Sequence, residues 1–129
     1  MKIRTVMVVD DDQDLREVLV IMLEAEGLIV IQAEHGRHAL ELMAIAAPHL
    51  IVLDLTMPVM DGCTFLAHKT KTEHATIPVV VFSSSLAAGI DSMASVETVV
   101  NKVEGMGALL EAIRRVVAKL AATPSLIAA

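Results

Sequence analysis

The chain has 129 residues, of which 55% are hydrophobic, and it contains two Phe but no Tyr or Trp. This length suits one domain with an aliphatic core, and no hydrophobic run approaches the ~18 residues that a membrane span requires. The formal net charge of −6 argues against direct binding to nucleic acid or to an anionic membrane. The single cysteine, Cys63, excludes an internal disulfide and fits a reducing, cytoplasmic compartment.

Hydrophobic runs alternate with segments of helical periodicity in the first half of the chain. The runs are continuous, as in strands that are covered on both faces, and Gly27 is a typical residue after the end of a helix. The expected strands cover 3–9, 28–33 and 49–54, and the expected helices cover 13–26 and 37–46.

The same alternation continues to residue 121. A loop with Pro58 and Gly62 leads into the next helix, and Pro78 precedes the fourth strand. The expected elements are a helix near 63–70, a strand at 79–83, a short weak helix at 86–94, a poor strand at 96–101 and a helix at about 106–121. Residues 2–121 therefore form the predicted domain, and 122–129 form a predicted flexible tail.

Five strand–helix units in succession predict an α/β fold with helices on both faces of a parallel sheet. The flavodoxin-like, doubly wound (βα)5 arrangement with strand order 2-1-3-4-5 is the natural choice for five such units. In this fold, sites lie beyond the carboxyl ends of the strands, near the switch point between strands 1 and 3.

Polar residues stand at the ends of the predicted strands. The first strand ends in Asp10 and Asp11, the third in Asp54, the fourth in Ser83 and the fifth in Lys102. If strands 1 and 3 are neighbours, three carboxylates converge, and they repel one another unless a cation or protons intervene. Oxygen ligands suit a hard divalent cation such as Mg²⁺. A carboxylate beside such a cation, a hydroxyl and an ammonium can accept a phosphoryl group.

Several of these stretches resemble the receiver domain of bacterial two-component response regulators. The matching stretches are VMVVDDDQDLRE, AEHGRHALELM, LIVLDLTMPVMDG, IPVVVFSS and VVNK. The resemblance as a whole runs from about residue 2 to 121. The resemblance implies a signalling switch that takes a phosphoryl group from a phosphohistidine. The phosphodonor would be a sensor histidine kinase or a histidine phosphotransfer protein.

The resemblance also implies a role for each site residue. Asp54 falls on the phosphoacceptor, and Asp10 and Asp11 fall on the acidic pair that holds Mg²⁺, with Asp11 as the direct ligand. Thr56 would lend its backbone carbonyl to the metal, so the implied metal set is Asp10, Asp11, Asp54 and Thr56. Ser83 falls on the hydroxyl that follows the phosphoryl group, and Lys102 falls on the lysine that pairs with Asp54 and then with the phosphoryl oxygens.

Three features depart from the pattern of this family. Val99 stands at the switch position that usually holds an aromatic ring, and Val103 stands where proline usually follows the lysine. The stretch from Ser83 to Lys102 is about one helical turn shorter than usual. We therefore expect an altered face on the fourth helix, the fifth strand and the fifth helix, and an effector protein that reads this altered face.

Other functions are compatible with parts of the sequence. A receiver-like interaction module that works without phosphorylation would explain Val99 and Val103, and an aspartyl-phosphate phosphohydrolase would explain the acids after the first strand. The phosphohydrolase leaves the motif around Asp54 unexplained. Because Met1 directly precedes the first strand and the tail is short, we expect a stand-alone regulator rather than part of a longer protein. The five histidines are scattered, and we expect them in turns or on the surface.

Overall fold

Five parallel strands form the centre of the molecule. The computed structural model describes residues 3–122. Its strands are β1 (Thr5–Val9), β2 (Ile29–Ala33), β3 (Leu50–Leu53), β4 (Val79–Ser83) and β5 (Val96–Asn101). Their order in the sheet is β2-β1-β3-β4-β5, and all four pairings are parallel. This confirms the predicted flavodoxin-like topology, with β1 and β3 side by side at the switch point.

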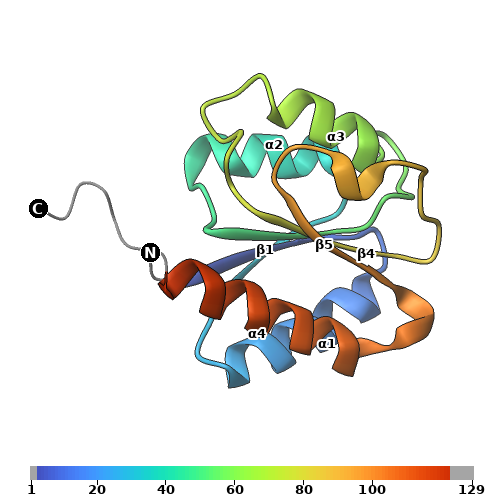
Figure 1. The fold of residues 1–129 in the computed structure, drawn as a ribbon. Helices are drawn as coiled ribbons and strands as arrows, with labels where there is room; N and C mark the ends of the chain where they lie inside the picture. The colour runs from blue at the N-terminus through green and yellow to red at the C-terminus, as the bar shows by residue number, and fades with distance from the viewer. Residues whose placement is uncertain (1–2, 123–129) are drawn as a thin grey trace, which may run out of the picture.

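Four α-helices cover the two faces of the sheet. They are α1 (Gln13–Ala25), α2 (Gly36–Ile45), α3 (Gly62–Lys69) and α4 (Met106–Ala122). Helices α1 and α4 lie on one face, and α2 and α3 lie on the other (Figure 1). The sheet therefore separates two hydrophobic clusters, one beneath α1 and α4 and one beneath α2 and α3. All residues of β3 and β4 are buried, as their continuous hydrophobic runs predict.

Aspartates begin two of the helices close to the carboxyl edge of the sheet. The Asp12 carboxylate accepts a hydrogen bond from the Leu15 amide at 3.2 Å and caps α1. The Asp61 carboxylate accepts one from the Thr64 amide at 2.8 Å and caps α3. These caps satisfy amide groups that have no partner within the helix. Asp12 and Asp61 thus fix the starts of α1 and α3.

The prediction of a short helix at 86–94 is wrong. This segment contains a single 3-10 turn, η1 (Ile90–Ser92), so residues 3–122 contain four α-helices instead of the five of a regular (βα)5 domain. Gly89 has φ +78° and Ser95 has φ +68°, and a residue with this left-handed backbone does not continue an α-helix. The connection is anchored instead by the buried side chain of Ile90.

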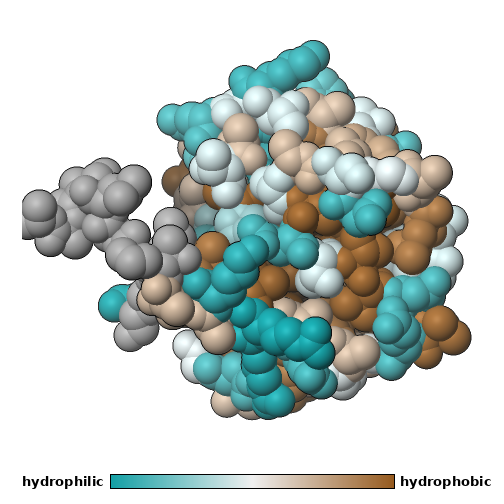
Figure 2. All heavy atoms as spheres, in the orientation of Figure 1, coloured by the Kyte–Doolittle hydropathy of each residue, from teal (hydrophilic) through white to brown (hydrophobic). Residues whose placement is uncertain are grey.

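The short β4–β5 connection leaves β5 incompletely covered. Five of its six residues are only partly buried, although it carries the hydrophobic side chains of Val96 and Val99. Figure 2 shows hydrophobic side chains at the surface on the side of the molecule where β5 and the β4–β5 connection lie. The prediction of an altered surface near β5 therefore has a structural basis in the missing helix.

The remaining sequence predictions lie close to the observed boundaries. Helix α4 extends through Ala122, and the rest of the predicted tail lies outside the described residues. Within residues 3–122, no helix is long and apolar enough to cross a membrane. His35 caps α2 by accepting a hydrogen bond from the His38 amide at 3.1 Å, which agrees with a role in a turn.

Candidate functional site

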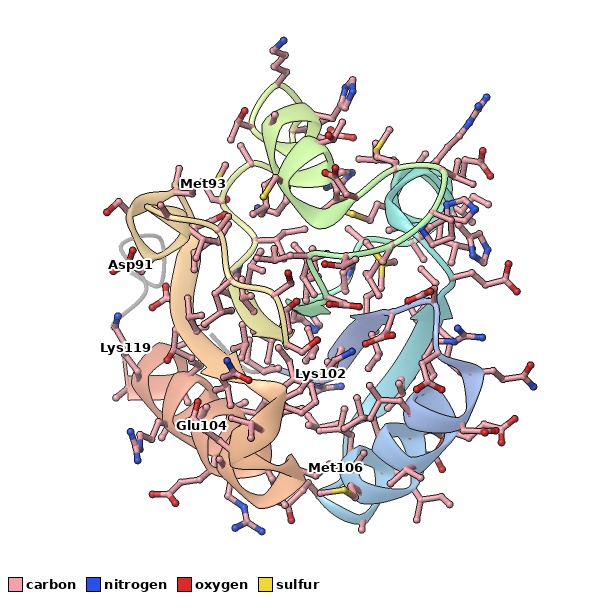
Figure 3. All side chains as sticks on the ribbon, turned by 90° about the vertical axis from the view of Figure 1, so that its right-hand side faces the viewer. Asp91, Met93, Lys102, Glu104, Met106 and Lys119 are labelled. Atoms are coloured by element: carbon pink, nitrogen blue, oxygen red, sulfur yellow. The ribbon has the colours of Figure 1, made fainter. Side chains whose placement is uncertain are left out.

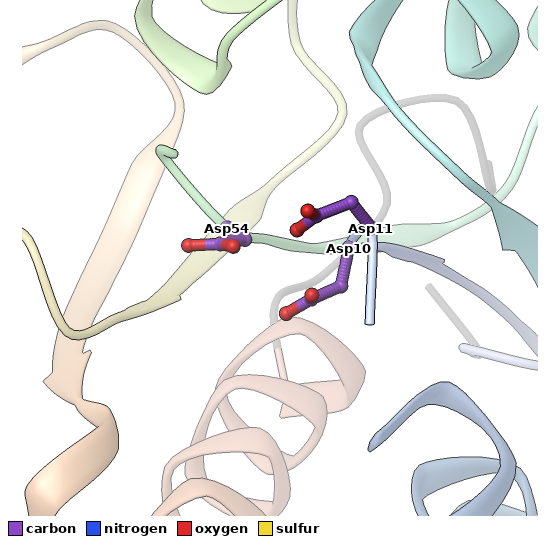
Figure 4. A group of neighbouring side chains, drawn as sticks. All are labelled: Asp10, Asp11 and Asp54. Atoms are coloured by element: carbon purple, nitrogen blue, oxygen red, sulfur yellow. The ribbon is translucent and has the colours of Figure 1, made fainter. Parts of the chain in front are cut away.

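Three aspartates meet beyond the carboxyl ends of β1 and β3. One carboxylate oxygen from each of Asp10, Asp11 and Asp54 lies within 4.8 Å of the others. Figure 4 shows the three side chains converging from the two neighbouring strand ends. Asp10 and Asp54 are 3% and 5% exposed, whereas Asp11 is open to solvent. The sheet order thus brings together acids that are separated by more than forty positions in the sequence.

Ser83 and Lys102 complete the cluster from β4 and from the residue after β5. The Ser83 hydroxyl donates a hydrogen bond to Asp54 Oδ1 at 2.7 Å and is fully buried. The Lys102 Nζ lies 2.9 Å from Asp10 Oδ2 and 3.4 Å from Asp54 Oδ2. One carboxylate oxygen of Asp54 therefore accepts a hydrogen bond from the Ser83 hydroxyl, and the other contacts the Lys102 ammonium.

Burial and hydrogen bonding shift the pKa values of Asp10 and Lys102 in opposite directions. Burial raises the pKa of Asp10 above its ordinary value and the Asp54 charge adds to the rise, whereas hydrogen bonds from Lys102 and the Asp12 amide oppose it. Burial disfavours the charged form of Lys102, but its contacts with Asp10 and Asp54 outweigh this effect and raise its pKa. A protonated Lys102 is therefore the cation that offsets part of the carboxylate repulsion.

Arg16 supports the acidic cluster from α1, and sequence reasoning missed it. Its Nη1 donates a hydrogen bond to the backbone carbonyl of Asp10 at 2.6 Å, and its Nε donates one to Gln32 Oε1 at 3.2 Å. Arg16 is only 7% exposed and lies on the same face of α1 as Leu19 and Leu23. Its spacing from these leucines is the signal that could have identified it as a buried arginine.

The other predicted positions lie around the cluster. The Thr56 amide donates to Asp54 Oδ1 at 3.4 Å, so this residue borders the Asp54 carboxylate. Val99 is partly buried and packs against the hydrophobic cluster beneath α2 and α3. Lys102 begins a 3-10 turn, η2 (Lys102–Glu104), and no peptide bond within residues 3–122 is cis, so the bond before Val103 is trans. Val103 is 86% exposed.

Gly62 lies where the loop after Asp54 approaches the end of β3. The Gly62 amide donates to the Leu55 carbonyl at 2.9 Å. A Cβ at this position would lie 2.4 Å from the Asp54 carbonyl oxygen and 2.7 Å from the Leu55 Cα. Both are backbone atoms, so a side chain could be accommodated only if the loop moved away from Asp54.

We expect Gly62→Ala to lower the free energy of unfolding by about 2 kcal/mol, because the new methyl group overlaps backbone atoms. Urea denaturation measures this loss. Gly107→Ala is the matched control, since a Cβ at Gly107 in α4 meets no atom within 4 Å and alanine favours helix. Equal stability of Gly62→Ala and the wild type would contradict the close approach.

The donor set of the cluster fits Mg²⁺. All three side chains offer carboxylate oxygens, which are the ligands that this hard cation prefers, and the exposure of Asp11 leaves room for bound water. A single lysine charge close to Asp10 and Asp54 leaves the group of three carboxylates net negative. A divalent cation would therefore remove a repulsion that the protein side chains only partly offset.

Comparison with known protein families gives one match that covers most of the chain. Residues 6–114 match the response regulator receiver domain. The chain belongs to this family. The five-stranded fold and the cluster of Asp10, Asp11, Asp54, Ser83 and Lys102 agree with the resemblance drawn from the sequence motifs.

Curated relatives share only part of their length with this receiver. An uncharacterized 14.6 kDa protein from Leptolyngbya boryana is 38% identical over 80 residues, which are 61% of each chain. The DNA-binding transcriptional regulator NtrC of Escherichia coli K12 is 37% identical over 79 residues, which are 61% of this chain and 17% of NtrC. The receiver thus spans less than two thirds of these relatives.

Solved structures share the fold along nearly the whole receiver. A response regulator receiver protein from Pseudomonas putida is 25% identical with a TM-score of 0.78, covering 89% of this chain and 98% of that one. The response regulator TrrA from Thermotoga maritima, solved in complex with Mg²⁺-BeF, is 23% identical with a TM-score of 0.74, covering 87% and 97%. The second likeness establishes the shared fold alone.

Proposed function

We propose that this receiver accepts a phosphoryl group from a phosphohistidine onto Asp54, with Mg²⁺ bound by the acidic cluster, and thereby changes its interaction surface. The observation that carries the proposal is the double contact of the Asp54 carboxylate. The Ser83 hydroxyl lies 2.7 Å from one oxygen and the Lys102 ammonium lies 3.4 Å from the other, beside two further aspartates.

In the proposed reaction an Asp54 carboxylate oxygen attacks phosphorus. A phosphorus–oxygen bond forms, the phosphorus–nitrogen bond of the donor breaks, and the imidazole nitrogen keeps the electron pair. Lys102 then turns from the carboxylates to the phosphoryl oxygens, and Ser83 donates its hydrogen bond to a phosphoryl oxygen instead of to Asp54 Oδ1. Both side chains thus stabilise negative charge that the transfer brings to this pocket.

Mg²⁺ would supply neutralisation of phosphoryl charge and orientation of the donor group. Asp11, Asp54 and the Thr56 backbone carbonyl would hold the metal directly, and Asp10 would act mainly through water. The complex of Thermotoga maritima TrrA with Mg²⁺-BeF makes this chemistry reasonable for the shared fold. Arg16 contributes by fixing the backbone of Asp10.

The proposed partners follow from this reaction. A sensor histidine kinase or a histidine phosphotransfer protein would supply the phosphoryl group in the cytoplasm, where kinases find ATP. An effector protein would read the surface around β5, which lacks the usual helix before it and carries partly exposed Val96 and Val99. The proposed receiver domain covers residues 2–121 and extends to Ala122, where α4 ends.

Acetyl phosphate with Mg²⁺ tests the proposal, because a small donor needs no cognate kinase. Intact-mass spectrometry should show one added phosphoryl group per chain, and Asp54→Asn should remove it. Repeated turnover of a phosphate ester would favour the phosphohydrolase instead. A wild-type protein that neither acquires the group nor responds to beryllofluoride would favour the interaction module that works without phosphorylation.

We also expect the acyl phosphate to persist well beyond seconds. The residues two positions after the acceptor and after the hydroxyl are Thr56 and Ser85, and neither carries a carboxylate or amide that would orient a hydrolytic water strongly. Thr56→Gln should shorten the lifetime, whereas Thr56→Val should not. Loss of radiolabelled phosphoryl measures the rate. A wild-type lifetime of only seconds would contradict this expectation.

A further inference from the structure

Lys69 is a fully buried lysine that the proposed phosphoryl transfer does not use. It ends α3 and lies on the same buried face as Phe65 and Leu66, with 0% of its surface exposed. None of the ion pairs between described residues includes Lys69. A buried ammonium without a carboxylate is costly, so its retention at a core position requires a structural reason.

The Lys69 amine bonds to two segments that are distant in sequence. Its Nζ donates to the Ala75 carbonyl at 2.9 Å, in the loop before β4, and to the Ser95 hydroxyl at 2.8 Å, directly before β5. Lys69 thereby connects the end of α3 to the two segments that lead into the neighbouring strands β4 and β5. The Ser95 contact reaches the shortened connection that replaces the missing helix.

Ser95 occupies the position from which β5 begins. Its backbone has φ +68°, and its carbonyl accepts a hydrogen bond from the Val79 amide at 2.8 Å. The pairing between β4 and β5 then shifts by one residue, because Val79 pairs with Val96 whereas Val80 pairs with Thr98. A non-glycine residue in this conformation is strained unless its surroundings hold it.

The start of β5 determines where Lys102 lies. β5 covers Val96–Asn101 and Lys102 follows it directly, so a change in register at Ser95 would displace the ammonium that contacts Asp10 and Asp54. In Figure 3 the segment with Asp91 and Met93 lies at the beginning of β5, and Lys102 lies beyond its other end. The strand thus connects the Lys69 contact with the acidic cluster.

We propose that Lys69 is a positioning residue for phosphoryl acceptance, which holds Ser95 in its left-handed conformation and so fixes the register of β5 and the place of Lys102. This proposal rests on the proposed function of Asp54. In a regular fold of this type, a fourth helix would anchor this segment to the sheet. Here two contacts hold the segment instead. One is the burial of the Ile90 side chain, and the other is the hydrogen bond from the Lys69 amine to the Ser95 hydroxyl.

Combined substitutions of Lys69 and Ser95 test this role. K69M keeps the length of the side chain but removes its donor, and we expect phosphorylation by acetyl phosphate with Mg²⁺ to slow about tenfold as Lys102 loses its place. Glycine adopts positive φ without steric cost and alanine does not. K69M/S95G should therefore recover most of the rate, whereas K69M/S95A should not.

Hydrogen exchange at the Val79 amide gives a second readout that needs no phosphorylation. This amide bonds to the Ser95 carbonyl, so its exchange should accelerate in K69M and slow again in K69M/S95G. Met43→Ala is the control, because it opens a cavity in the hydrophobic cluster beneath α2 and α3 but removes neither hydrogen bond of Lys69. It should accelerate exchange of the Val79 amide no more than exchange of other core amides. If K69M does not fold, Ser95→Ala alone removes the same contact and should accelerate Val79 exchange.

Two results would overturn the role of Lys69. One is a K69M protein whose phosphorylation rate and Val79 amide exchange rate equal those of the wild type. The other is a pair of variants, K69M/S95G and K69M/S95A, with equal phosphorylation and exchange rates. If the wild type accepts no phosphoryl group, the proposed function fails. Val79 exchange then decides separately whether Lys69 holds the start of β5.

Discussion

Lys102→Met should lower the rate of phosphorylation by acetyl phosphate about 100-fold or more, while Mg²⁺ binds more tightly. The ammonium is the only lysine or arginine charge that forms an ion pair with the acidic cluster among the described residues. Its removal takes a cation away from the transferring oxygens, where a single lost donor typically costs 10²–10³-fold. The same removal also relieves repulsion between the ammonium and the metal.

Opposite changes in rate and metal affinity are the informative result. Radiolabelled acetyl phosphate measures the rate, and isothermal titration calorimetry measures Mg²⁺ binding. Lys119→Met serves as the control, because Lys119 pairs with Glu97 at 2.9 Å near the start of β5 and lies far from Lys102 in Figure 3. A Lys102→Met protein with the wild-type rate would show that this lysine takes no part in the transfer.

The wild-type protein should gain about 3 kcal/mol of stability relative to K69M between pH 8 and pH 10.5. Burial lowers the pKa of Lys69 from 10.5 to about 8 in the folded protein. In this window the unfolded chain binds the proton and the folded chain does not, so the free energy of unfolding rises with pH. Below pH 8 both states are protonated and the gain is absent. Each pKa unit corresponds to about 1.4 kcal/mol.

Comparison with two variants isolates this contribution from other alkaline titrations. The chain has no tyrosine, but burial and the Asp61 carboxylate raise the pKa of Cys63 from 9.0, which would lower stability as pH rises. This effect is common to the wild type, K69M and the control Lys71→Met, whose lysine is exposed. Urea denaturation at pH 7.5 and pH 10 measures the difference. Parallel pH dependence of the wild type and K69M would contradict a neutral Lys69 in the folded protein.

The strand ends of this receiver could be read from the sequence because hydrophobic runs stop at charged residues there. Asp54 follows four fully buried positions, and Asp10 follows β1 in the same way. Once strands 1 and 3 are neighbours, their terminal acids must meet, so the cluster follows from topology and pattern alone. Ser83 and Lys102 were placed by the same reasoning at the ends of β4 and β5.

The shortness of the β4–β5 connection could be predicted from the sequence, but its conformation could not, because local composition is a weak guide there. Residues 86–94 include good helix formers, but Gly89 adopts positive φ and the segment is too short for tertiary packing to stabilise a helix. The burial of Lys69 could not be predicted either, because a lysine on a helix is normally solvent-exposed. Only its spacing from Phe65 and Leu66 indicated a buried position.

We propose that Asp54 accepts a phosphoryl group beside a metal held by its neighbouring acids. A crystal structure of the protein grown with Mg²⁺ and beryllofluoride tests it most directly. We expect beryllofluoride on an Asp54 oxygen, within hydrogen-bond distance of Ser83 and Lys102, and one cation between Asp11 and Asp54. Beryllofluoride on another carboxylate, or an Asp54 that binds neither beryllofluoride nor a cation at saturating concentrations, would contradict the proposed phosphoryl acceptance.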